Sequence, residues 1–296
     1  GTNAASLLVS TAGLSISNAI VLATNPTAGT LTVGTTGSLT DNVIYSGGIT
    51  GTNNLTIANT VGTGKALTFS TATINNTGTV TNTGTGAGTT TISGGIGTNV
   101  TSVTQSSTTA PLSITGAVTV NSSGTTLIVG SGASTFTVSG GTTGTGNLTL
   151  QNNSATNNNL TLQTTSINNV GTITNSGSGT GAVSISAQIG TNVTGVTQDS
   201  SSSTLILSGN NLYNSNTTIN NGTLQITSNT GLGSTTGRTI VNANGILDLH
   251  NVTVGAEPVT LAGGTIKDVT SSLSGDITLT ANSTVSATNS DDILTL

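Results

Sequence analysis

Short runs in which apolar and polar residues alternate recur along the whole chain. Examples are Leu31-Thr32-Val33, Leu55-Thr56-Ile57 and Leu148-Thr149-Leu150. Each run places two apolar side chains on one face of a strand and a hydroxyl on the other. Gly- and Asn-rich clusters such as Asn75-Asn76-Thr77-Gly78 separate the runs and suit the left-handed backbone of tight corners. The pattern predicts many short β-strands joined by tight corners.

The chain also contains a long internal repeat that includes several of these short runs. Residues 96–107 return as residues 189–200, at an offset of 93 residues. The offset divides the chain into modules at approximately 14–107 and 112–200 and a divergent third part at 201–296. Apolar pairs recur roughly every 6 to 12 residues, so we expect each module to contain four or five coils of roughly 20 residues.

Parallel stacking of such coils predicts an all-β fold, a parallel β-helix that forms one continuous β-solenoid over residues 1–296. Its core would be a thin column of inward Val, Ile and Leu side chains. At about 4.8 Å per coil, the rod would be on the order of 70 Å long. The Gly-, Ser-, Thr- and Asn-rich composition also raises disorder as an alternative, but the regular apolar periodicity argues against it.

The composition narrows the possible functions. The chain has 296 residues with 41 Gly, no Cys, and 4% charged residues. With three Lys and Arg residues it cannot neutralise many phosphates, so we expect no nucleic-acid partner. The sequence has no apolar run long enough to cross a membrane as a helix. Without cysteine, a thiolate nucleophile or a sulfur-ligated metal is excluded.

One segment carries a family resemblance. Residues 204–226 contain a strand, then Ser208-Gly209-Asn210-Asn211, Tyr213, and the run Thr217-Thr218-Ile219-Asn220 followed by Gly222-Thr223-Leu224. This order resembles the autotransporter-associated β-strand repeat of bacterial passenger domains. The resemblance implies a parallel β-helix that is exported by a Gram-negative cell and displayed at its surface. The family's membrane-attached C-terminal barrel would then lie beyond this stretch.

Candidate catalytic chemistry is sparse. The one histidine, His250, shares a predicted strand face with Asp248, which could orient the imidazole for proton transfer. We interpret both residues as outward, solvated neighbours of the core residue Leu249. Thr-x-Thr pairs such as Thr71 with Thr73 and Thr278 with Thr280 suggest ice binding as a possible function. Their uneven spacing along the sequence does not predict the regular threonine array that an ice-binding face needs.

These observations lead to a structural, non-catalytic hypothesis. We expect an extracellular or cell-surface solenoid that forms a stalk, a filament or a layer, self-associates end to end or laterally, and carries no cofactor, metal or catalytic site. The alternative is an adhesin that recognises a host glycan or protein through its last third, where the chemically varied residues lie. Ice binding and polysaccharide cleavage are further alternatives. The predicted adhesive surface consists of Arg238, His250, Glu257 and Lys267.

Overall fold

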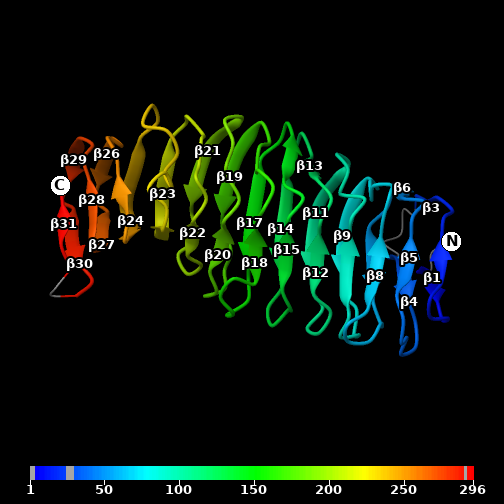
Figure 1. Cartoon of the computed structure of the whole chain (residues 1–296). Coiled ribbons are helices and arrows are strands. Elements are labelled where there is room, and N and C mark those ends of the chain that lie inside the picture. The colour runs from blue at the N-terminus through cyan, green and yellow to red at the C-terminus, as the bar shows by residue number, and fades with distance from the viewer. Residues whose placement is uncertain (1–3, 25–29, 290–291) are drawn as a thin grey trace.

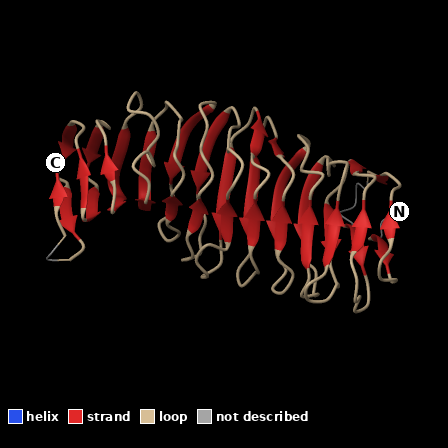
Figure 2. Ribbon diagram, in the orientation of Figure 1, coloured by secondary structure: helices blue, strands red, loops and turns tan. Residues whose placement is uncertain are grey.

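The chain forms a stack of β-coils that together make an elongated solenoid (Figure 1). The computed structural model describes residues 4–24, 30–289 and 292–296. The described part contains 31 strands and no helix, and hence no helix that could span a membrane (Figure 2). Among the described residues, the named strands of successive coils pair in parallel, and about 12 turns follow one another. The predicted fold class is therefore confirmed.

Each coil contributes up to three short strands, which stack into three faces that we call A, B and C. Face A consists of β1 (Ala5–Val9), β4 (Leu31–Thr35), β7 (Leu55–Ala58), β9 (Gly78–Asn82), β11 (Val100–Gln105), β14 (Thr125–Val129), β17 (Leu148–Asn152), β19 (Gly171–Asn175), β21 (Val193–Gln198), the first parts of β23 (Thr217–Ile226) and β24 (Thr239–His250), β26 (Val259–Ala262) and β29 (Ile277–Ala281).

Face B follows face A in each coil, and face C closes the coil. Face B consists of β2 (Ser15–Ile16), β5 (Val43–Tyr45), β8 (Ala66–Phe69), β10 (Thr89–Ile92), β12 (Leu112–Ile114), β15 (Phe136–Val138), β18 (Leu160–Leu162), β20 (Val183–Ile185), β22 (Leu205–Leu207), the second parts of β23 and β24, β27 (Thr265–Val269) and β30 (Thr284–Ala287). Face C consists of β3 (Ile20–Leu22), β6 (Ile49–Gly51), β13 (Val118–Val120), β16 (Thr142–Gly144), β25 (Thr253–Val254), β28 (Ser271–Leu273) and β31 (Leu294–Thr295), with single bridges in several coils between them.

The register of face A sets the size of a coil. Leu31 pairs with Leu55, Leu55 with Val80, and Val80 with Val103, which gives steps of 23 to 25 residues. In the last third the step falls to about 20, between β24 and β26, and to about 18, between β26 and β29. The coils are thus mostly larger than the predicted 20 residues. With about 12 turns, the rod is roughly 58 Å long at 4.8 Å per turn, shorter than expected.

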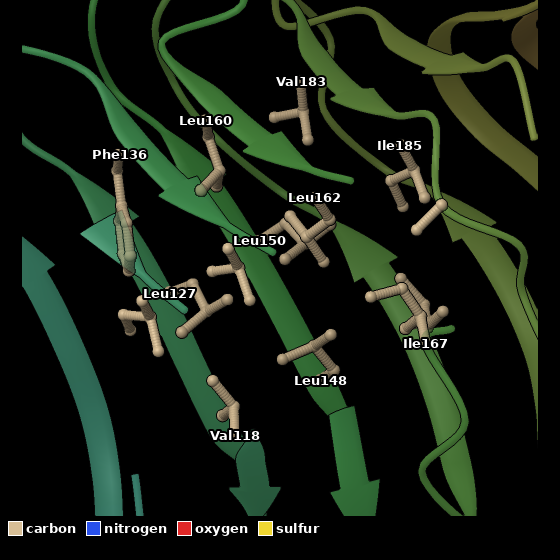
Figure 3. Packing of buried hydrophobic residues seen from close by; sticks show 14 of the residues in the cluster. Val118, Leu127, Phe136, Leu148, Leu150, Leu160, Leu162, Ile167, Val183 and Ile185 are labelled. Atoms are coloured by element: carbon tan, nitrogen blue, oxygen red, sulfur yellow. The ribbon is translucent and has the colours of Figure 1, made fainter. Parts of the chain in front are cut away.

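Alternation along each strand creates the core. In face B, Phe136 pairs with Leu160, which pairs with Val183, and all three side chains have no exposed surface. Figure 3 shows these side chains stacked with others from face A in the interior of the coil. Full burial of each such side chain contributes about 1.5–3 kcal/mol. Every coil therefore depends on the coils above and below it for its core.

The corner between faces A and B changes along the rod. It is a loop of seven residues between β17 and β18, and of six residues between β21 and β22. In β23 and β24 the chain instead passes from face A to face B as one continuous strand. Buried amides hold the earlier loops: Asn82 Nδ2 donates to Gln105 Oε1 at 2.7 Å, and Asn175 Nδ2 donates to Gln198 Oε1 at 2.8 Å.

The segment that resembles the autotransporter repeat is structural. Tyr213 is fully buried, and its hydroxyl lies 2.6 Å from Thr217 Oγ1 in β23. Asn211 accepts a hydrogen bond from the Ile189 amide at 2.9 Å and donates to the Gly231 carbonyl at 2.8 Å. The motif therefore ties three successive coils together.

Candidate functional site

A column of outward hydroxyls runs along face A. The pairing of each strand with the next brings one side chain per coil into a continuous line. The column consists of Thr79, Ser102, Thr126, Thr149, Thr174, Thr197, Thr218, Thr260 and Thr278, and Ile240 interrupts it between Thr218 and Thr260. A second column, formed by Thr32, Thr56, Thr81 and Thr104, ends at Ile128. The stacking thus makes hydroxyl columns that are more regular than the spacing of Thr-x-Thr pairs in the sequence suggests.

Face B has a different outward column, whose chemistry changes along the rod. Its first two thirds carry mainly Thr and Ser, and the Thr161 hydroxyl donates to Thr137 Oγ1 at 3.2 Å. In the last third the same line continues through Ile206, Gln225, Asp248 and Lys267. Chemical variety is therefore concentrated at this part of face B.

Asp248 and His250 have different surroundings in the structure and do not contact each other through a hydrogen bond. Both follow the alternation of β24, with Leu249 buried between them. Asp248 is 5% exposed, and its Oδ2 accepts a hydrogen bond from Gln225 Nε2 at 2.9 Å. No hydrogen bond joins Asp248 to His250, although both residues are described. Asp248 is buried and not solvated as predicted, and it lies between Gln225 and Lys267 in the outward column of face B.

The four residues of the predicted adhesive surface do not form one patch. Arg238 is exposed and directly precedes the face A part of β24. Lys267 lies in the middle of the face B strand β27, and His250 lies at the end of the face B part of β24. Glu257 is only 2% exposed, since its side chain points into the coil, so it contributes nothing to an exposed surface.

Glu257 instead belongs to a buried polar cluster. Its Oε1 accepts a hydrogen bond from Thr239 Oγ1 at 2.9 Å, while no partner for Oε2 occurs among the described residues. Burial raises the pKa of Glu257 to about 7, and the hydrogen bond from Thr239 partly opposes this. Burial also raises the pKa of Tyr213. Raised values of this kind occur in structural interiors as well as in active sites.

A metal centre has no support in the described residues. They contain no group of three or more His, Asp or Glu side chains that could hold an ion. The one ion pair that the structure describes, Lys65 with Asp41 at 3.5 Å, lies on the surface and contributes little to stability.

No protein-family model, no curated protein and no solved structure matches the chain.

Proposed function

We propose that this chain is a non-catalytic structural solenoid, displayed outside a Gram-negative cell as a stalk or as part of a filament or layer. The observation that carries the proposal is the uninterrupted stacking of about 12 turns, each buried against the next. In such a stack every coil is held by backbone hydrogen bonds to two neighbours, so bending requires many bonds to stretch together. Stiffness along the rod is what a spacer needs.

The surface chemistry suits an extracellular setting and contact with other copies. The chain has only 4% charged residues, and its columns present hydroxyl groups at intervals of about 4.8 Å. Matching columns on two rods could exchange many weak hydrogen bonds, as cross-strand Thr pairs do within a sheet. Lateral packing is therefore our expected mode of self-association.

Surface display can be tested on the organism that makes the protein. A short epitope inserted at Gly132, in the exposed loop between β14 and β15, should be tolerated because an added Cβ there meets no atom within 4 Å. We expect an antibody to label intact cells or their extracellular fibres. Labelling that requires lysis of the cells would overturn the proposed location.

The structural role itself needs a separate test. Small-angle scattering of the purified chain should give a rod about 58 Å long, and electron microscopy should show lateral bundles at high concentration. Thr149→Lys and Thr174→Lys, in the middle of the face A column, should dissolve the bundles by charge repulsion. Thr137→Lys, on face B, is the matched control. Bundles that persist in the Thr149→Lys and Thr174→Lys variants, or a chain that stays monomeric at every concentration, would contradict lateral self-association.

A further inference from the structure

The row of loops between faces A and B ends abruptly at β22. These loops contain seven residues after β17, seven after β19 and six after β21, whereas β23 and β24 pass the corner without a loop. In Figure 1 the lower edge of the rod carries loops in its green part and lacks them around β23 and β24. The end of the row leaves a step beside face B.

A recess of about 330 Å³ occupies this step. Asn157 and Asn158 of the loop before β18 form its wall, Ile206 and Gln225 lie along it, and Asp248 and Lys267 line its far end. Four of these residues lie on the successive face B strands β22, β23, β24 and β27, which together span roughly 14 Å. Its shape is therefore long and narrow.

Asp248 contributes a carboxylate oxygen to the recess whose hydrogen-bonding capacity is not used by any described residue. Its Oδ2 is held by Gln225, but Oδ1 is shielded from solvent and has no hydrogen-bond partner among the described residues. Lys267, its neighbour on the next strand, forms no ion pair with it within the described part of the chain. A buried carboxylate oxygen without a donor is costly, and a ligand that brings a donor would remove that cost.

We propose that this recess binds a neutral saccharide, a role that goes beyond the structural function. The formal charges of Asp248 and Lys267 cancel, which favours a neutral ligand over an ionic one. A sugar hydroxyl would donate to Asp248 Oδ1, and the amides of Asn157 and Asn158 can both donate and accept. Ile206 offers an apolar contact to the carbon-bound hydrogens of a ring. Because Oδ1 is shielded from solvent, a side chain that covers it must move aside for the hydroxyl to reach it.

The recess is suited to binding and not to cleavage. Glycoside hydrolysis ordinarily requires two carboxylates that face each other across the bond. Asp248 is the one carboxylate among the residues that line the recess. The bound saccharide would therefore be retained intact.

The test is an NMR titration of the isotope-labelled full chain with four neutral disaccharides: cellobiose, maltose, lactose and diacetylchitobiose. We expect at least one of them to shift the side-chain amide signals of Asn157, Asn158 and Gln225. If none of the four shifts these signals, or if digalacturonate alone does so, the proposal is overturned. The length and surface display of the rod are independent of this result, so the structural proposal would stand.

Two variants and one control make the test specific. In Asp248→Asn the amide oxygen can keep the bond from Gln225, which leaves a donor in place of Oδ1; we expect binding to weaken at least tenfold. Asp276→Asn removes a carboxylate from an exposed position outside the recess and should bind as the unaltered chain does. Asn158→Gly removes a wall amide at a position with φ 56°, which glycine tolerates, and should also weaken binding. Unchanged affinity in both recess variants would overturn the proposal.

Discussion

Thr90 Oγ1 donates a hydrogen bond to Asn82 Oδ1 over 3.0 Å in the interior of the solenoid, at the corner between faces A and B. At the equivalent position of the next module Val183 replaces Thr90, and Asn175 Oδ1 is buried there without a partner among the described residues. The two modules thus share the same buried amides but do not satisfy them equally.

This difference predicts opposite responses to exchanging the two residues. Thr90→Val should lower the free energy of unfolding by about 1–3 kcal/mol, because Asn82 Oδ1 loses its donor. Val183→Thr should raise it by up to about 1 kcal/mol, since the new hydroxyl can reach Asn175 Oδ1. Urea unfolding followed by circular dichroism measures both changes. An equal decrease in the free energy of unfolding in the two variants would show that these hydrogen bonds do not contribute to stability.

Two strained corners predict stabilising substitutions. Thr71 and Thr164, 93 residues apart, have φ angles of 66° and 71° at the corner between faces B and C. A β-branched residue in this region costs about 1–3 kcal/mol, more than the roughly 0.5–1 kcal/mol that glycine costs through its flexibility. Thr71→Gly and Thr164→Gly should therefore each raise the midpoint of thermal unfolding. Thr91→Gly, in the regular strand β10, is the control and should lower it.

Much of the fold could be predicted because its determinants are local. Alternation within a strand is enough to assign Leu55, Ile57, Leu148 and Leu150 to the interior, and all four are buried. The similar alternating run Ile277-Thr278-Leu279 behaves differently: Leu279 is 66% exposed, because β29 pairs with β26 alone in the described part of the chain. Burial depends on a neighbouring coil as well as on the pattern of the strand itself.

The candidate site could not be predicted for the same reason. The recess exists because corner loops of different lengths lie next to each other across coils, and no single run of sequence contains that information. Alternation gave Asp248 an outward direction, which is correct, but could not show that it is buried there, or that Asn157 and Asn158, about 90 residues earlier, line the same recess.

Close contact between coils predicts a severe effect at one glycine. A Cβ added to Gly146 would overlap the carbonyl oxygen of Asn121 in the preceding coil, and this backbone cannot move without breaking the ladder. We expect Gly146→Ala to cost about 3 kcal/mol or more. Gly255→Ala is the control, since a Cβ there meets no atom within 4 Å. Similar melting temperatures for the two variants would contradict the tight stacking.

An inward carboxylate predicts a large gain in stability when it is removed. Asp268 has no exposed surface, stacks on Leu249 in face B, and has no hydrogen-bond partner for either oxygen in the described residues. Because burial of an unpaired carboxylate is costly, Asp268→Val should raise the free energy of unfolding by about 2 kcal/mol or more at neutral pH. Asp276→Val changes an exposed carboxylate in the same region and should have little effect. A loss of stability in Asp268→Val would mean that the carboxylate has a stabilising partner.

Glu257 predicts a dependence of stability on pH. Its pKa is raised from 4.5 to about 7 in the folded chain, with burial as the main cause. Below pH 4.5 the carboxyl is protonated in both the folded and the unfolded chain, so it has no effect on stability. Between these two values the unfolded chain releases the proton more readily, and stability falls as the pH rises. Well above pH 7 the loss is complete, and a shift of this size corresponds to at most roughly 3 kcal/mol, less where solvent screens the charge.

The matched variant is Glu257→Gln, which retains an acceptor for Thr239 Oγ1 and cannot ionise. It should unfold at a higher urea concentration than the unaltered chain at pH 8 and at nearly the same concentration at pH 4.5. Other carboxylates also titrate in this range, so the informative quantity is the difference between the two chains at each pH. A difference that stays constant from pH 4.5 to pH 8 would show that Glu257 ionises equally in the folded and unfolded states, and that its burial carries no electrostatic cost.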